Sequence, residues 1–169
     1  MATNLEFIKT ESGIGVTTLT VADCFSSAYD VYFMSISKAK FSSNAYTQIR
    51  FMDSSGTVIN QTEYDYASLD MYANTGYANL YGTGQSSIPN FGLAQSGVSD
   101  FGGISTFIFN PYQSDTYTSV KTISSSFSSQ GRATQNIGLH KSAEQLSGIQ
   151  LNRSAGDAFD MEINMYGVK

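Results

Sequence analysis

The chain has 169 residues, enough for one domain with a hydrophobic core and too few for two comfortable ones. Charged residues make up only 14% of the chain and the net charge is −5 without a basic cluster, which argues against a nucleic-acid partner. No stretch approaches the ~18 apolar residues of a membrane-spanning helix, and no basic segment followed by an apolar run indicates a secretory leader. We therefore expect no membrane partner and synthesis in a cytoplasm.

Strand patterns dominate the first half of the chain, and helical periodicity is hard to find. The segments that read as strands are β-branched or aromatic and lie at 16–25, 29–41 and 46–52. At its start 29–41 is apolar on both parities, which predicts a strand that is first covered on both faces and then becomes open. The tetrapeptide "DSSG" at 53–56 suits a tight turn, and predicts a hairpin between 46–52 and 57–66. Between 67 and 103 glycine and asparagine interrupt the pattern, which indicates one or two short strands joined by long, ordered loops.

Strand signals become regular again in the second half. Residues 104–112 are apolar on both parities and predict a central strand, ended by Asn110-Pro111. Further strands are predicted at 117–130, 132–142 and 147–154, and "RSAGDA" then suits a hairpin loop before the last strand. The last strand alternates strictly, which predicts one buried face and a place inside a sheet; its apolar positions are Phe159, Met161, Ile163 and Met165.

These elements predict an all-β fold. About eight to ten short strands with turn signals between them favour a β-sandwich. A jelly roll fits best because long connections must cross between its two sheets, and an aligned sandwich of another topology is the alternative. We expect a single sandwich domain over 16–169, preceded by an N-terminal arm at 1–15.

Catalytic and cofactor signatures are not found. Cys24 is the single cysteine and reads as a buried small hydrophobe. His140 is the single histidine; its parity is opposite to that of Ile137 and Leu139, so we expect it to face solvent or a neighbouring subunit. One histidine and one cysteine cannot form a His/Cys zinc site within one chain. The sequence therefore predicts no enzyme, no cofactor, no metal and no catalytic residue.

Two groups of carboxylates offer alternatives to this reading. Glu63 and Asp65 lie two apart on an expected strand and would share a face, as a glycosidase pair could. Asp157, Asp160 and Glu162 cluster near the last loop and could help to bind calcium. In both groups a solvated strand face is the favoured interpretation.

Tyrosines form the most suggestive set of candidate contact residues. Tyrosine combines a large apolar body with a polar tip, which suits protein interfaces and sugar-stacking platforms as well as a tryptophan-free core. The candidates for interface or glycan contacts are Tyr64, Tyr66, Tyr72, Tyr77 and Tyr81.

The ending "SGIQLNRSAGDAFDMEINMYGVK" resembles that of many small structural proteins of tailed bacteriophages. That ending has an Ile-x-Leu strand, a short glycine-containing loop with an aromatic, and a last strand that closes on aromatic-Gly-aliphatic. The corresponding positions here are Ile149, Leu151, Gly156, Phe159, Ile163, Tyr166, Gly167 and Val168. "FIFNPY" at 107–112 is similar to a segment that those proteins carry upstream. The acidic Asp160 and Glu162 depart from the pattern, in which a basic residue often follows the aromatic.

The resemblance implies a non-enzymatic β-sandwich carried on a virus particle. The expected role is that of a capsid decoration (cement) protein, which binds the assembled head and stabilises it. Its expected partners are the major capsid protein or other virion proteins, and its expected state is a homotrimer in a virion assembled in the host cytoplasm. The alternative is a tail, fibre or receptor-binding module that recognises host surface glycans.

Overall fold

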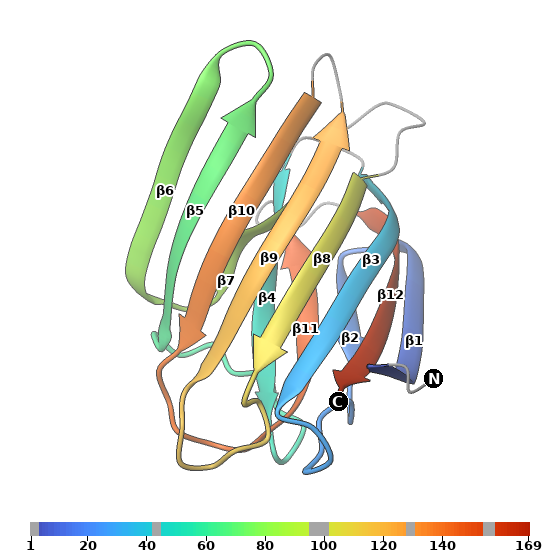
Figure 1. The fold of residues 1–169 in the computed structure, drawn as a ribbon, viewed down its shortest axis with the longest axis vertical. Coiled ribbons are helices and arrows are strands. Elements are labelled where there is room, and N and C mark those ends of the chain that lie inside the picture. Colours follow the sequence, from blue (N-terminus) through green and yellow to red (C-terminus); the bar gives the residue numbers. More distant parts are fainter. Residues whose placement is uncertain (1–3, 42–44, 95–101, 128–130, 154–157) are drawn as a thin grey trace.

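The computed structural model describes residues 4–41, 45–94, 102–127, 131–153 and 158–169, and these residues form two antiparallel sheets without a helix (Figure 1). The larger sheet lies in front in Figure 1 and has eight strands in the order β1 (Leu5–Val16), β12 (Phe159–Val168), β3 (Val31–Phe41), β8 (Gly102–Phe109), β9 (Thr118–Phe127), β10 (Gly131–His140), β5 (Tyr64–Tyr72) and β6 (Gly76–Gln85). The smaller sheet lies behind it, in the order β2 (Thr18–Val21), β11 (Leu146–Arg153), β4 (Ala45–Asp53) and β7 (Ile88–Ala94). Among these residues we find no helix that could span a membrane.

Two long stretches of chain wind around each other as an antiparallel pair. The stretch β3–β4–β5 runs against β12–β11–β10, so that β3 pairs with β12, β4 with β11 and β5 with β10. The first and third of these pairs belong to the large sheet and the middle pair to the small one. A ribbon that is rolled in this way across two sheets is jelly-roll-like, and the predicted all-β sandwich is confirmed.

Apolar side chains fill the space between the sheets, because alternate residues of each strand point to it. The core residues on these strands include Tyr32, Met34, Ile36, Ile49, Phe51, Ile88, Ile104, Ile108, Ile149, Leu151 and Ile163. Gly138 of β10 allows the sheets to approach, since a Cβ there would lie 2.5 Å from the Ile88 side chain. Cys24 is buried as predicted, and burial raises the pKa of its thiol to about 12.

The terminal strand is confirmed as an interior member of a sheet. β12 lies between β1 and β3, and all four of its predicted apolar positions are buried. The predicted central strand is also confirmed, since β8 lies between β3 and β9. Its two apolar faces have different environments, however: Ile104 and Ile108 are buried whereas Phe107 is exposed.

The expected hairpin around residues 53–56 is only half correct. The turn forms, and the Asp53 carboxylate accepts hydrogen bonds from the Ser55 and Thr57 amides at 2.8 and 2.9 Å; bonding to Ser55 above all lowers the pKa of Asp53. After it, however, Val58 makes a single bridge to Met52 and the chain leaves the small sheet. Further along β4, from Ala45 to Ile49, β7 takes the side that a hairpin strand would need, so the chain after the turn can pair only with the end of β4.

Three further expectations need correction. Residues 67–103 are more regular than predicted, because within the described part they continue β5 and form β6, β7 and the start of β8. The predicted hairpin loop "RSAGDA" lies mostly outside the described residues, and the strands on either side of it belong to different sheets. From Leu5 onward the predicted arm is the edge strand β1, which pairs along most of β12.

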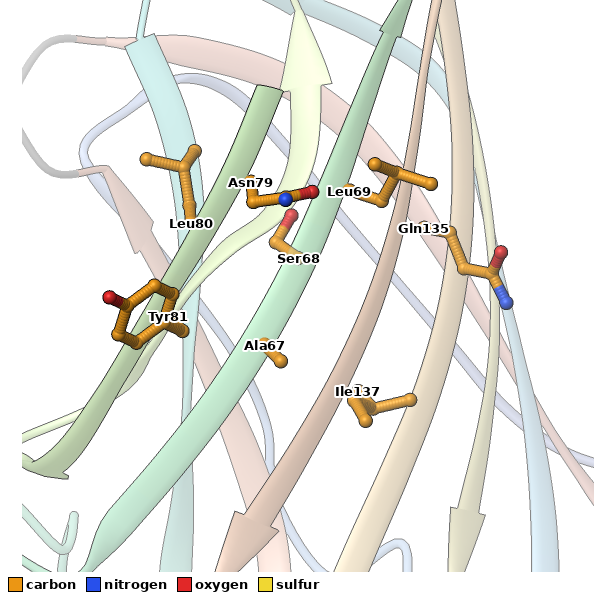
Figure 2. Close-up of a pocket in the computed structure, with 8 residues that line it drawn as sticks. All are labelled: Ala67, Ser68, Leu69, Asn79, Leu80, Tyr81, Gln135 and Ile137. Carbon is orange, nitrogen blue, oxygen red and sulfur yellow. The ribbon is translucent and has the colours of Figure 1, made fainter. Parts of the chain in front are cut away.

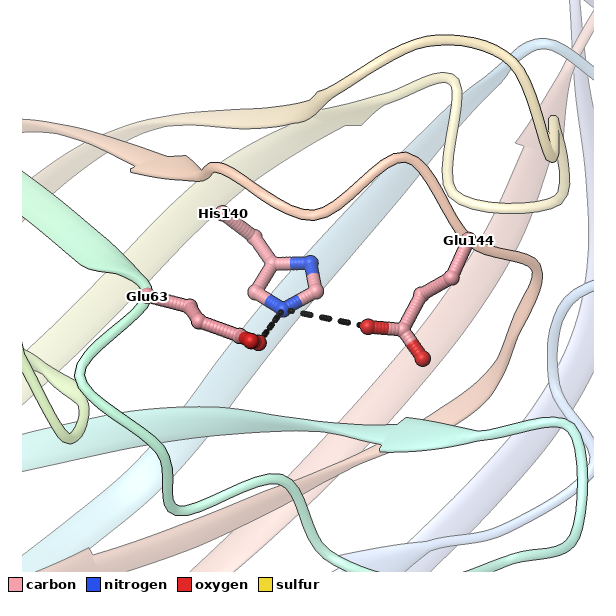
Figure 3. A group of neighbouring side chains, drawn as sticks. All are labelled: Glu63, His140 and Glu144. Carbon is pink, nitrogen blue, oxygen red and sulfur yellow. Dashed lines mark hydrogen bonds and ion pairs between the residues drawn. The ribbon is translucent and has the colours of Figure 1, made fainter.

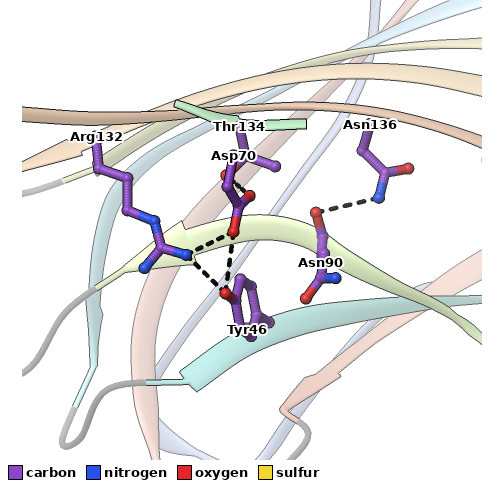
Figure 4. A network of polar contacts seen from close by, with 6 residues as sticks. All are labelled: Tyr46, Asp70, Asn90, Arg132, Thr134 and Asn136. Carbon is purple, nitrogen blue, oxygen red and sulfur yellow. Dashed lines mark hydrogen bonds and ion pairs between the residues drawn. The ribbon is translucent and has the colours of Figure 1, made fainter. Parts of the chain in front are cut away.

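A buried polar network replaces apolar packing where β5 and β10 face β4 (Figure 4). The Arg132 guanidinium donates to the Asp70 carboxylate at 2.6 Å and to the Tyr46 hydroxyl at 2.6 Å. Tyr46 and Thr134 also donate to Asp70, at 3.0 and 2.8 Å. Because Tyr46 belongs to the small sheet and the other three to the large one, the network joins the two layers.

Candidate binding surface

The face of the large sheet that points away from the small sheet carries a row of directly opposed residues across all eight strands. We call this set the aromatic row: Tyr81, Ala67, Ile137, Lys121, Phe107, Phe33, Tyr166 and Phe7, from β6 to β1. Seven strand spacings of about 4.8 Å give the row a length of about 34 Å. It exists because the alternation of each strand and the register between strands place these positions side by side.

The aromatic row is open to solvent. Tyr81 is 80% exposed, Phe7 62%, Ile137 54% and Phe107 41%. Neighbouring rings contact one another: Phe33 lies 5.2 Å from Phe107 and 6.1 Å from Tyr166, between ring centroids. Large contiguous patches of exposed apolar side chains are rare on soluble monomeric proteins. Where they occur, they often mark a binding surface.

A second row runs beside the first and is mostly polar and uncharged. We call it the polar row: Asn79, Leu69, Gln135, Ile123, Ser105, Ser35, Asn164 and Thr10. Lys121 is the single charged residue of the two rows. The two rows therefore offer rings, amides and hydroxyls and very little charge.

A depression lies where the two rows cross β6, β5 and β10 (Figure 2). It has a volume of about 510 Å³, and Tyr81, Asn79, Gln135 and Ile137 are among the residues that line it. A second depression of about 440 Å³ continues the groove over β9 and β8, past Lys121 to Phe109. The groove thus follows the direction of the aromatic row.

The predicted tyrosines do not form one group. Tyr77 and Tyr81 are 73% and 80% exposed on β6, which carries no buried residue. Tyr64 is fully buried, where its hydroxyl donates to the Ile59 carbonyl and accepts from the Phe51 amide, so it is not a surface residue. Tyr66 packs against the core and Tyr72 against the Arg132 guanidinium.

Sequence reasoning missed most of the aromatic row, namely Phe7, Phe33, Phe107 and Tyr166. The signal was present, because 29–41 and 104–112 carry apolar residues on both parities. We interpreted that pattern in 29–41 as a strand covered on both faces, as it is in parallel sheets, and in 104–112 as a central strand. In this antiparallel sheet one of the two faces is open.

The orientation predicted for His140 is wrong. Its side chain is fully buried, whereas Ile137 is exposed. The physical reason is that β10 turns a polar set towards the small sheet, with Thr134 and Asn136 on the same side as His140. The imidazole lies next to two carboxylates, Glu63 and Glu144 (Figure 3).

The candidate carboxylates are engaged with separate partners. Asp65 accepts from the Lys141 ammonium at 2.9 Å and from the Gly84 amide at 2.8 Å, and bonding to Lys141 above all lowers its pKa. Glu63 lies instead against His140, so the two do not act on one site as a glycosidase pair would. On β12 Glu162 pairs with Lys38 and Asp160 accepts from the Gly15 amide, while Asp157 lies outside the described residues.

No protein-family model matches the chain, and no curated protein matches its sequence. Among solved structures, the marine PL-14 alginate lyase from Aplysia kurodai is 9% identical over 93% of this chain and 80% of the lyase, with a TM-score of 0.40. The exo-inulinase from Aspergillus awamori is 11% identical over 98% of this chain and 29% of the inulinase, with a TM-score of 0.43. The enzymatically active domain of a tailspike protein of bacteriophage CBA120 is 13% identical over 99% of this chain and 20% of that domain, with a TM-score of 0.26.

These similarities are consistent with the all-β fold and carry no argument about activity, because identities are very low and each TM-score is under 0.5. The three proteins are enzymes by name, so the similarities do not support the expectation that this chain is not an enzyme. That expectation stays a prediction.

Proposed function

We propose that the chain is a structural protein of a virus particle that attaches to its neighbours through the aromatic row. The exposed rings of the row are the observation that carries this proposal, because they are an interaction surface without a described partner. The resemblance of the C-terminal ending to small phage structural proteins supports the viral setting. The favoured role is capsid decoration by a homotrimer, with the major capsid protein as its partner.

The two rows are large enough to form the centre of a stable protein contact. They lie about 7 Å apart along the strands and cover about 480 Å² of a face about 34 Å long. A standard interface buries about 800 Å² on each partner. The rings can form its apolar centre, and the amides and hydroxyls of the polar row can form its rim.

The mechanism of stabilisation follows from mass action. A protein that binds the assembled lattice and not its free subunits lowers the free energy of the assembled state, by an amount that grows with its occupancy. Because the contact surface is nearly uncharged, attachment should depend little on salt.

We expect the double substitution Phe107→Ser, Ile137→Ser to leave the chain folded and to remove its attachment. Both side chains are largely exposed, so the loss of folding stability should be small. Virions assembled with this variant should carry few copies of it and should lose infectivity on heating like virions without the chain. Copy number by quantitative mass spectrometry and infectivity after heating provide the measurements.

The control is Tyr117→Ser, since Tyr117 is 53% exposed but lies before β9 and outside both rows. It should attach like the unaltered chain. Normal attachment of the double variant would exclude the aromatic row as the docking surface. Virions that never contain the chain would overturn the viral role itself.

The depression beside Tyr81 favours a second candidate function, the binding of a host glycan. An exposed tyrosine ring and the amides of Asn79 and Gln135 line the same depression, and they offer a stacking surface and hydrogen bonds to hydroxyl groups. This geometry would suit a tail, fibre or receptor-binding module.

In a glycan array, the purified chain should then bind one class of oligosaccharide. Tyr81→Ala and Gln135→Ala should each reduce that binding at least tenfold, while Tyr117→Ala should not change it. An array without any bound glycan would contradict the glycan function and would leave the attachment role standing.

A further inference from the structure

We propose that Glu63, His140 and Glu144 form a binding site for one first-row divalent cation, with Zn²⁺ as the best fit. This inference is independent of the proposed attachment role. Two segments that are distant in the sequence supply the three side chains, one with Glu63 and the other with His140 and Glu144 (Figure 3). Glu63 directly precedes β5, His140 is the last residue of β10, and Glu144 lies in the connection to β11.

The backbone holds these segments in place. The Lys141 amide donates to the Glu63 carbonyl at 2.8 Å, which ties the end of β10 to the start of β5. His140 is directly opposed to Tyr64 in the β10–β5 pairing. The Leu146 amide donates to the Pro111 carbonyl at 2.9 Å, which fixes the connection that carries Glu144. The imidazole also packs against the Tyr64 and Phe51 rings, which limits its rotation.

The distances between the three ligand atoms suit a single small cation. His140 Nε2 lies 3.3 Å from Glu63 Oε2 and 3.7 Å from Glu144 Oε1, and all three atoms lie within 4.8 Å of one another. In a tetrahedral zinc site with bonds of about 2.0–2.2 Å, ligand atoms lie about 3.3–3.5 Å apart. The His140–Glu144 separation of 3.7 Å and the separation of the two carboxylate oxygens, which is at most 4.8 Å, would shorten when the cation binds.

The three side chains leave a place for positive charge between them. His140 Nε2 faces both carboxylates and can carry at most one proton, so its N–H can serve only one of the two. A divalent cation would neutralise both carboxylates and bind the imidazole nitrogen at the same time.

One side of the cluster opens into a cavity, which gives an ion access. The cavity has a volume of about 320 Å³ and is lined by Glu63 and Glu144 together with Asn60, Gln61 and the Asp53–Thr57 turn. Three protein ligands and an open fourth position are typical of zinc sites that keep a bound water.

Moderate affinity is expected. When the cation takes Nε2, the ring proton must move to Nδ1, which is buried and has no hydrogen-bond partner among the described residues. Strong zinc sites provide an acceptor for that proton. We therefore expect a dissociation constant in the micromolar range.

The first test is titration of the tag-free, chelator-treated chain with ZnCl₂ by calorimetry. One Zn²⁺ should bind per chain, and saturation at about a hundred times the dissociation constant should raise Tm by roughly 5–10 °C. Glu63→Gln and Glu144→Gln should each weaken binding at least tenfold. Both side chains are partly exposed, so these variants should fold.

Asp65→Asn is the matched control, because it removes the same charge two residues from Glu63 and should leave Zn²⁺ binding unchanged. His140 is the only histidine, so its ring resonances in an NMR spectrum need no assignment by mutagenesis. Zn²⁺ should shift them in the unaltered chain. Three results would each overturn the site. They are no binding at millimolar Zn²⁺, binding by both glutamate variants as tight as that of the unaltered chain, and binding that leaves the ring resonances unshifted.

Discussion

Deletion of Met165–Lys169 is expected to leave a chain that does not fold. These residues are paired on both sides, with β1 and with β3, so their loss leaves residues 5–9 of β1 without a partner and residues 31–34 of β3 with β8 alone. Met165 is also fully buried, and emptying a methionine site costs about 2–5 kcal/mol by itself. A domain is stable by only about 5–15 kcal/mol in total. Far-UV circular dichroism and solubility measure the outcome.

Removal of Lys169 alone is the control for this deletion. Lys169 is exposed and pairs with Glu6 at the surface, and exposed ion pairs contribute little. That variant should melt close to the unaltered chain. If the chain without Met165–Lys169 melted at the same temperature as the unaltered chain, the fold would not need the last residues of β12.

Asp70→Ala should destabilise the fold by about 3–5 kcal/mol, because it leaves the Arg132 guanidinium in the interior without its carboxylate. Tyr46 and Thr134 would also lose their acceptor. Urea denaturation measures the change in the free energy of unfolding.

The double substitution Asp70→Leu, Arg132→Met separates the loss of a partner from the loss of the ion pair. Removing both charges takes away the desolvation cost along with the attraction, so the double variant should be clearly more stable than Asp70→Ala. As an exposed comparison, Glu162→Gln removes the Lys38–Glu162 pair and should lower the free energy of unfolding far less than Asp70→Ala does. If Asp70→Ala and Glu162→Gln lowered the free energy of unfolding by the same amount, the buried network would stabilise the fold no more than an exposed ion pair does.

The candidate sites could be predicted from the sequence only in part. Exposed tyrosines of β6 were among the candidates, but nothing local distinguished Tyr81 from the buried Tyr64. The cluster of Glu63, His140 and Glu144 was not predicted, because counting histidines and cysteines leaves out carboxylate ligands. It also depends on a strand pairing that joins residues 77 positions apart.

The amino-acid sequence by itself determined the all-β class, most strands of the second half and the buried face of the last strand. Those properties follow from alternation of side chains along a strand, which is local and can be read from a few residues. Only the tertiary structure decided which face of β3 and β8 is covered, which way His140 points and which strands flank the Asp53 turn. These properties depend on which sheet packs against which face and on long-range register, and a local pattern carries neither.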